Sequence, residues 1–386
     1  HHHLYQNMTR AVPAAQDALL FGWLKALYPI WARMGPEEIQ VSALLGLAEL
    51  AFSGCTCSAD HLYLFPNGAR LDDEVEAALE IGVRLHATRG AMSVGESAGG
   101  LPPDDLVEPE AAILEDCLRV IRAFHDPEPG AMIRVAVAPC SPFSVSRELM
   151  RDAAVLAREH DVMLHTHLAE NGEDVAFSLE MFGVRPGAYA EELGWTGADV
   201  WHAHCVKLDA AEIDLFARSK TGVAHCPCSN MRLGSGIAPV RALRDAGVKV
   251  GLGVDGSASN DAANLMAEAR QAMLLQRVEH GADAMSAREA LEIATLGGAA
   301  ALGRPDLGAL TPGRRADFAV FPVDGDAAVG MSGVWDPIAG LLMSGPLRAR
   351  DTYVEGKPVI RDGRLVTMDL RQLIQRHRQL AEKLMA

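Results

Sequence analysis

The sequence predicts an α/β fold: a (β/α)8 barrel of the TIM type, followed by a small C-terminal β-sandwich piece. Three observations support this. Short apolar, β-rich runs alternate with helical runs through most of the 386 residues. Histidine and carboxylate side chains gather where the strand-like runs end, which is where barrels of this type carry their chemistry. Beyond residue 305 the alternation stops and turn-rich β segments follow.

Eight runs have the apolar character of buried parallel strands. They cover residues 1–5, 54–64, 83–93, 132–139, 162–168, 199–206, 221–226 and 248–254. Helical periodicity predicts helices over 72–82, 108–125, 146–160, 171–182, 209–219, 239–246, 264–281 and 286–303. A doubly wound open sheet shows the same alternation, so the arrangement of the polar residues has to decide between the two folds.

The chain divides into three predicted parts. Residues 1–305 form the barrel. Residues 306–368 form a small β domain, because its strand-like runs are separated by Gly-containing turns such as Asp362-Gly363. Residues 369–386 form a polar, amphipathic C-terminal helix.

Composition excludes several classes of function. The formal net charge is −16 and no run of Lys or Arg occurs, so neither nucleic acid nor an anionic membrane surface is an expected partner. No apolar stretch reaches the ~18 residues of a membrane span, and no signal peptide is visible. Seven cysteines, an odd number spread along the chain, favour reduced thiols and a cytoplasmic location. Their two C-x-C pairs lack the spacing of a cysteine zinc site.

Reactive side chains gather at the ends of five predicted strands. They are His1, His2 and His3; His165 and His167, with Glu170 just beyond; His202 and His204; His225; and Asp255. Alternate residues of a strand share a face, so His1/His3, His165/His167 and His202/His204 are each expected to point two imidazoles the same way. Imidazole and carboxylate are ligands of zinc and related cations, which predicts a metal site at this end of the barrel.

Some of these histidines have a second interpretation. Three histidines at an N-terminus are also typical of a cut purification tag. His2 and His165 stay open between ligand and core residue, because only one face of each strand can see the site. The histidines without a partner motif are expected to be core or surface residues: His61, His86, His125, His160, His280 and His377.

Six segments, in this order, resemble the amidohydrolase superfamily, specifically its branch of purine and triazine aminohydrolases. They are "HHHLYQ", "HTHLAE", "HAHCVKL", "HCPCSNMRLGSGIAPV", "GVDGSASND" and the tail "GRRADFAVF … VEGKPVIRDGRLV". With "HHHLYQ…TRAVPAAQ" and "APCSPFSVS", the chain is most similar to the 8-oxoguanine deaminases of that branch. A tag would not be followed by Leu-Tyr-Gln at the family's spacing, so the first histidines are expected to belong to the protein.

The resemblance implies a mononuclear metal site and its acid–base residues. One divalent metal, Zn²⁺ with Fe²⁺ as the alternative, would be held by His1, His3, His167 and Asp255. Glu170 would act as acid and base, His204 would contact the hydrolytic water, and Asp255 would also accept a proton. The strand over 132–139 contains no lysine, which argues against a carboxylated lysine that bridges two metals.

The resemblance also suggests substrate contacts. Gln6 is a candidate hydrogen-bond partner for the edge of a purine. Cys140, Trp23 and Arg89 are candidates to line the pocket, and for Trp23 core packing is an equal explanation. Relatives that act on nucleosides usually carry His where Cys140 stands, which favours a free base over a ribosylated substrate.

The implied reaction is the hydrolytic deamination of a free purine base, with 8-oxoguanine converted to urate and ammonia. Guanine or an aminotriazine is the alternative substrate. A non-catalytic binding protein on the same fold is a different class, but it would be expected to lack metal ligands or Glu170. The compact cytidine deaminase fold needs P-C-x-x-C, which "PCSNM" does not supply.

Two further expectations follow from the resemblance. Relatives are often homo-oligomers, which makes a homo-oligomer compatible with the sequence. Relatives also begin some tens of residues earlier, so the first strands of the small β domain are expected to lie before residue 1.

Overall fold

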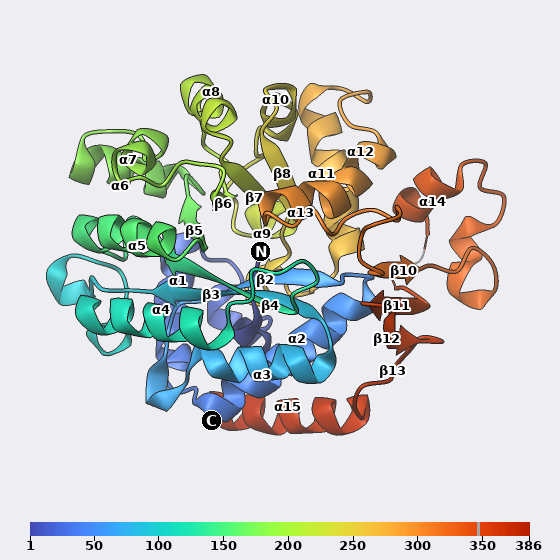
Figure 1. Ribbon diagram of the computed structural model, residues 1–386, viewed down its shortest axis with the longest axis horizontal. Helices are drawn as coiled ribbons and strands as arrows, with labels where there is room; N and C mark the ends of the chain where they lie inside the picture. Colours follow the sequence, from blue (N-terminus) through green and yellow to red (C-terminus); the bar gives the residue numbers. More distant parts are fainter. Residues whose placement is uncertain (346–347) are drawn as a thin grey trace.

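A barrel of parallel strands forms the centre of the molecule in the computed structural model, which describes residues 1–345 and 348–386 (Figure 1). Its strands are β1 (His2–His3), β2 (Cys57–Leu62), β3 (Arg84–Ala91), β4 (Ile133–Pro139), β5 (Met163–Leu168), β6 (Val200–His204), β7 (Gly222–His225), β8 (Lys249–Leu252) and β9 (Asp255–Gly256). Neighbouring strands pair in parallel, in chain order from β1 to β8.

The sheet closes on itself through its last strand. β8 pairs with β7, and β9 pairs with β1. Only Gly253 and Val254 separate β8 from β9, so the two are halves of one strand that bridges both ends of the sheet. This closure confirms the predicted (β/α)8 fold and rules out the open, doubly wound alternative.

The first strand is shorter than the predicted 1–5. The backbone N–H of Leu4 donates a hydrogen bond to Asp60 Oδ1 at 2.6 Å instead of joining a ladder. The 3-10 helix η1 (Leu4–Thr9) therefore begins directly after His3. Strand β1 therefore ends at His3, whose imidazole points into the barrel.

Helices surround the barrel (Figure 1). They are α1 (Leu20–Trp31), α2 (Pro36–Phe52), α3 (Leu71–Ile81), α4 (Glu110–Phe124), α5 (Arg147–Glu159), α6 (Gly172–Phe182), α7 (Pro186–Glu192), α8 (Ala210–Ser219), α9 (Pro227–Arg232), α10 (Val240–Asp245) and α11 (Leu265–His280). Short 3-10 turns are η2 (Pro13–Ala15), η3 (Pro66–Gly68), η4 (Glu96–Ala98), η5 (Asp104–Leu106) and η7 (Asp326–Met331). Of these helices, α1, α2, α7 and α9 are not among the predicted elements.

The predicted helix over 286–303 is interrupted. It comprises α12 (Ala287–Glu292), a π-helical turn η6 (Ile293–Gly297) and α13 (Gly298–Ala301). A Cβ added to Gly251 of β8 would lie 2.8 Å from Gly298 Cα. The glycines therefore allow α13 to lie directly on the barrel.

A second, antiparallel sheet lies beside the barrel, at the right of Figure 1. Its strands are β10 (Phe318–Val320), β11 (Asp351–Val354), β12 (Lys357–Arg361) and β13 (Arg364–Leu365). This single four-stranded sheet is the small C-terminal β part that the sequence predicts. Helix α14 (Pro337–Met343) precedes β11, and α15 (Leu370–Met385) packs against α2. The division at residues 305 and 368 stays a prediction.

A buried ion pair joins the barrel to this sheet. Arg84 of β3 is 0% exposed and donates from Nε to Asp317 Oδ2 at 2.6 Å and from Nη2 to Asp317 Oδ1 at 2.9 Å. It also pairs with Glu355. Two parallel N–H···O bonds of this kind fix direction as well as distance, so the pair orients the sheet on the barrel.

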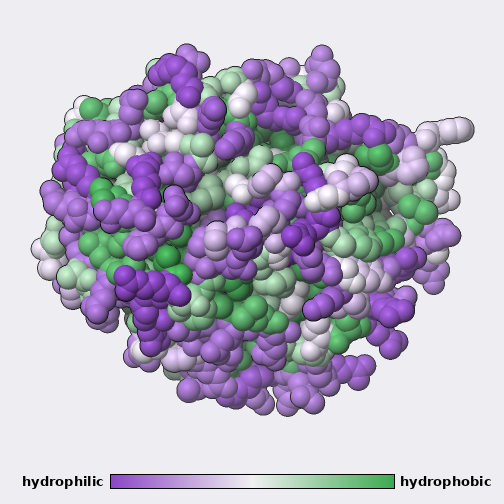
Figure 2. Space-filling model, viewed as in Figure 1, coloured by the Kyte–Doolittle hydropathy of each residue, from purple (hydrophilic) through white to green (hydrophobic). Residues whose placement is uncertain are grey.

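The surface mixes polar and apolar groups. In Figure 2 hydrophilic residues cover most of the outline, and hydrophobic residues form patches between them. Within residues 1–345 and 348–386, no helix has the length and apolar character needed to cross a membrane. All seven cysteines lie in this part of the chain and are free thiols.

Candidate active site

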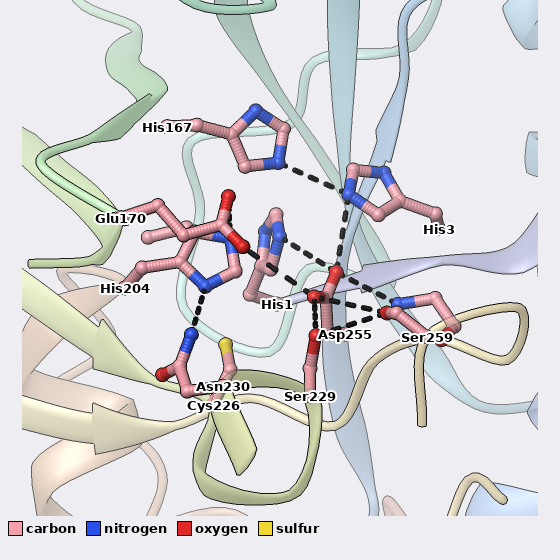
Figure 3. Close-up of polar contacts among 12 residues, drawn as sticks. His1, His3, His167, Glu170, His204, Cys226, Ser229, Asn230, Asp255 and Ser259 are labelled. Atoms are coloured by element: carbon pink, nitrogen blue, oxygen red, sulfur yellow. Dashed lines mark hydrogen bonds and ion pairs between the residues drawn. The ribbon is translucent and has the colours of Figure 1, made fainter. Parts of the chain in front are cut away.

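Side chains from the strand ends meet in one buried cluster (Figure 3). His3 Nε2 lies 3.1 Å from His167 Nε2 and 3.2 Å from Asp255 Oδ1. His1 Nε2 lies 3.5 Å from the same Asp255 oxygen. The structure thus brings together the four residues expected to hold a metal: His1 just before β1, His3 of β1, His167 of β5 and Asp255 of β9.

Hydrogen bonds at the far side of each ring fix which nitrogen faces the cluster. Nδ1 of His3 lies 2.7 Å from the His61 carbonyl, and Nδ1 of His167 lies 2.6 Å from the Cys140 carbonyl. A carbonyl only accepts, so both Nδ1 atoms carry the proton and both Nε2 atoms present lone pairs. Lone pairs that face each other at 3.1 Å repel unless a positive charge lies between them.

The donor set fits a divalent cation. Zinc–nitrogen bonds of about 2.0–2.1 Å in a tetrahedron place neighbouring donor atoms about 3.3 Å apart. The separations here are 3.1, 3.2 and 3.5 Å. Within the described residues His1 Nε2 is buried without a hydrogen-bond partner, as expected for a ligand atom that needs a metal. His1, His3 and Asp255 form one candidate cation group in which all ligand atoms lie within 4.8 Å of one another.

Asp255 is held as an oriented anion. Its Oδ2 accepts hydrogen bonds from Ser229 Oγ at 2.5 Å and Ser259 Oγ at 3.2 Å, and its Oδ1 accepts from the Gly256 N–H at 2.8 Å. Burial alone would raise the pKa of Asp255, but its contacts with His3 and His204 and the hydrogen bond from Ser229 keep this pKa well below its usual value. Oδ1 thereby faces the imidazoles as a carboxylate.

Glu170 and His204 complete the polar wall (Figure 3). His204 Nε2 lies 3.6 Å from Glu170 Oε2 and 4.0 Å from Asp255 Oδ2. Asn230 Nδ2 donates to His204 Nδ1 at 3.0 Å, so the proton of the neutral ring is on Nε2 and points at the two carboxyl groups. Burial lowers the pKa of His204 to about 4, which keeps the ring neutral near pH 7.

The two carboxyl groups of the cluster have opposite protonation tendencies. Burial raises the pKa of Glu170 well above its usual value, and the negative charge of Asp255 raises it further. Glu170 therefore favours the protonated form beside an ionised Asp255. Titratable pairs whose environments separate their pKa values in this way are typical of acid–base catalysis.

Left-handed backbone at the strand ends aims these side chains. Ala169, His204 and Asp255 have φ values of 51°, 71° and 60°. The expectation that His202 and His204 share a direction is wrong for this reason. His202 instead bonds to the Trp195 carbonyl at 2.9 Å and lies beside Phe216 of α8, outside the barrel. The φ of His204 breaks the strand alternation and turns its ring into the site.

A cavity of about 40 Å³ adjoins the cluster, and three of the four candidate substrate contacts line it, namely Gln6, Trp23 and Cys140. Gln6 is 1% exposed, and within the described residues its Oε1 has no hydrogen-bond partner. Trp23 Nε1 donates to the Ala258 carbonyl, which leaves the face of the indole as its free surface. Burial raises the pKa of the Cys140 thiol to about 12, so it is a neutral group and not a nucleophile. The other lining residues are His3, Leu20, Leu24, Tyr63, Phe143, His167, Glu170, His204, Leu233, Asp255 and Ser259.

Arg89 does not line this cavity. It is 2% exposed and pairs with Glu108 and Asp116, so its expected pocket role is wrong and its role is structural. A larger, mainly apolar cavity of about 350 Å³ lies between the start of β2, the end of β8 and the C-terminal sheet. Neither Glu170 nor His204 lines it, so a choice of active site by cavity volume alone would select the wrong cavity.

Several residues of the site are not among the sequence predictions. Ser229 and Asn230 lie in "HCPCSN", in helix α9, and Ser259 lies in "GVDGSASND". The signal for them is their place just after predicted strands. His61 is a core residue, as expected, yet its carbonyl orients His3. His165, which the sequence leaves open, bonds to His1.

Comparisons with known proteins agree with this geometry. Residues 1–363 match the amidohydrolase family. The 8-oxoguanine deaminase of Pseudomonas aeruginosa is 47% identical over 100% of this chain and 86% of its own length. The hydroxydechloroatrazine ethylaminohydrolase of Pseudomonas sp. strain ADP is 39% identical over 97% of this chain and 79% of its own. The crystal structure of atrazine chlorohydrolase from Arthrobacter aurescens complexed with zinc has a TM-score of 0.93 and 37% identity, covering 99% of this chain and 86% of that one. The chain therefore belongs to the amidohydrolase family, as a hydrolase of carbon–nitrogen bonds.

Proposed function

We propose that this protein is a zinc-dependent aminohydrolase that converts 8-oxoguanine and water to urate and ammonia. One observation carries the proposal: imidazole lone pairs, an ionised Asp255 and a protonated Glu170 converge on a single small cavity. A non-catalytic binding protein would have no use for two carboxyl groups of opposite protonation. The 47% identity to an 8-oxoguanine deaminase supports the choice of substrate.

The metal would be held by Nε2 of His1, His3 and His167 and by Oδ1 of Asp255. When bound, a divalent metal acts as a Lewis acid that lowers the pKa of a water molecule towards about 7. Oδ2 of Asp255, the carboxylate oxygen that would not bind the metal, accepts a proton from that water. His204 orients it through Nε2–H, which lies between the two carboxyl groups.

Glu170 supplies the acid. Its proton goes to the ring nitrogen beside the attacked carbon, which makes that carbon more electrophilic. Oxygen then adds to the carbon, and the amino group takes up a proton through Glu170 or Asp255 and leaves as ammonia. Because Glu170 is 5% exposed, bulk water cannot replace it as the proton donor.

The cavity favours a flat base without a sugar. Gln6 offers an unpaired amide oxygen to a ring N–H, Trp23 offers an aromatic face, and Cys140 offers a small neutral wall. Cys140 lines the cavity and stands where relatives that act on nucleosides usually carry His, so the exclusion of nucleosides is part of the proposal.

A substrate panel on zinc-loaded protein tests it. Ammonia or alkylamine release would be measured with 8-oxoguanine, guanine, a hydroxylated alkylaminotriazine and adenosine, with and without a chelator. We expect the highest kcat/KM for 8-oxoguanine, at least tenfold above the others, and reversible loss of activity on chelation. Preference for the triazine would assign the second candidate, which the 39% identical ethylaminohydrolase supports. No release from any of these compounds would contradict the proposed function.

A further inference from the structure

His1 differs from the other metal-facing imidazoles in what holds it. His3 and His167 each donate Nδ1–H to a backbone carbonyl. His1 Nδ1 instead lies 3.0 Å from His165 Nε2, a side-chain atom. No side-chain substitution removes the two carbonyls, whereas the partner of His1 can be changed by mutation.

The direction of this hydrogen bond follows from the next contact. His165 Nδ1 lies 3.0 Å from the Trp201 carbonyl, which only accepts, so His165 Nδ1 carries the proton. His165 Nε2 then has the lone pair and accepts from His1 Nδ1–H. This leaves the lone pair of His1 on Nε2, the atom that lies 3.5 Å from Asp255 Oδ1.

The ring of His165 is itself fixed. It is 0% exposed and stacks on the indole of Trp201, with centroids 4.7 Å apart and planes at 16°. A stacked ring with its Nδ1–H committed to a carbonyl cannot turn to offer the other nitrogen. The chain Trp201 carbonyl–His165–His1 therefore has one hydrogen-bonded arrangement.

We propose that His165 is a positioning residue that sets the tautomer and orientation of His1 and thereby the affinity of the metal centre. The inference rests on the proposed function, since it requires that His1 be a ligand. Residues that hydrogen-bond to a ligand histidine typically change metal affinity by about 10–100-fold when mutated.

A second cation site is the competing explanation. Ligand atoms of His1, His61 and His165 also lie within 4.8 Å of one another. A cation there would need a lone pair from Nδ1 of His1, while the first site needs one from Nε2. A neutral imidazole has only one such lone pair, so the two sites exclude each other.

Zinc affinity of three His165 variants tests the proposal. Gln places an acceptor near the position of imidazole Nε2, and Asn is one methylene shorter and reaches only the Trp201 carbonyl. Leu has similar volume and no acceptor. We expect His165→Gln to bind zinc within about threefold of the parent, and His165→Asn and His165→Leu to bind about 10–100-fold more weakly. The readout is competition with a chromophoric chelator on the full chain, after circular dichroism has shown each variant to be folded.

His202→Gln is the matched control. It also replaces a buried barrel histidine that bonds to a backbone carbonyl, but His202 faces α8 and not His1. Its zinc affinity should equal that of the parent. If His165→Leu does not fold, the proposal is tested by comparing the zinc affinities of His165→Asn and His165→Gln.

Three results would overturn the inference. The first is parental zinc affinity in both His165→Leu and His165→Asn, and the second is a Gln variant as weak as Asn. The third is two zinc ions per parent chain, which would favour the second site. A parent that binds no zinc, or binds it equally well after His3→Ala, would instead refute the proposed metal centre itself.

Discussion

Replacing Glu170 with glutamine should stop turnover and leave the metal in place. Glutamine has nearly the same size and can still accept the hydrogen bond from Ser235 Oγ, which lies 3.5 Å from Glu170 Oε1. It cannot deliver a proton. The titratable group beside it is His204, whose Nε2 lies 3.6 Å from Glu170 Oε2. Its pKa of about 4 leaves it as a neutral imidazole, which is a weak acid.

The size of the effect follows from the role. Positioned acid–base groups contribute about 10²–10⁴-fold, which is about 3–5 kcal/mol of activation free energy. Since Glu170 is 5% exposed and Asp255, the other carboxyl group that lines the cavity, is ionised, we expect kcat to fall by at least about 10³-fold.

The assay is the initial rate of urate formation at saturating 8-oxoguanine, measured beside zinc content per chain. Glu170 belongs to none of the candidate cation groups, so one zinc per chain should remain. Glu173→Gln is the control, because Glu173 is exposed on the first turn of α6. Parental activity within tenfold in zinc-loaded Glu170→Gln would refute the assigned role.

Three further outcomes are expected. Ser229→Ala removes the 2.5 Å hydrogen bond to Asp255 Oδ2 and leaves only the longer one from Ser259, so kcat/KM should fall roughly 10–100-fold; no change would show that Ser259 alone orients the carboxylate. Arg84→Met leaves the carboxylate of Asp317, whose side chain is 3% exposed, without its partner, and should lower the free energy of unfolding in urea by about 3–5 kcal/mol without changing zinc affinity. Burial lowers the pKa of His202 from 6.5 to about 4, so the unfolded chain takes up a proton that the folded one excludes. Stability should therefore fall as the pH drops from about 6.5 to about 4, by about 3 kcal/mol from this group, and His202→Gln should flatten that part of the stability–pH curve.

The barrel could be predicted because the features that define its strands are local patterns in the sequence. Strands buried on both faces need continuous apolar runs, and each of the eight predicted runs contains one of the observed strands β1 to β8. Asp255 stood out because a carboxylate directly after such a run has no packing role. The pairs His1/His3 and His165/His167 follow the strand alternation, so their convergence could also be anticipated.

Other features depend on contacts that no local pattern contains. The bond between His1 and His165 joins residues 164 positions apart, and the opposite protonation of Glu170 and Asp255 arises only when burial and neighbouring charges are known. Helix α2 did have a local signal, since Pro36 at its first position and Glu37 and Glu38 in its first turn are typical of a helix start. Helix α1 had no comparable signal and places Trp23 over the cavity.

The departure of His204 from the strand rule connects backbone strain with chemistry. A non-glycine residue in the left-handed region costs of order 1–3 kcal/mol, and it persists only where the surroundings fix it. His204 and Cys205 both have this conformation, with φ values of 71° and 52°, and both are at most 1% exposed. An unstrained strand would turn His204 towards α8, as it does His202, and leave Glu170 and Asp255 without the Nε2–H between them. Packing around β6 therefore stabilises a local conformation that the isolated sequence disfavours, and the residue that violates the strand alternation is the one that we propose orients the reacting water.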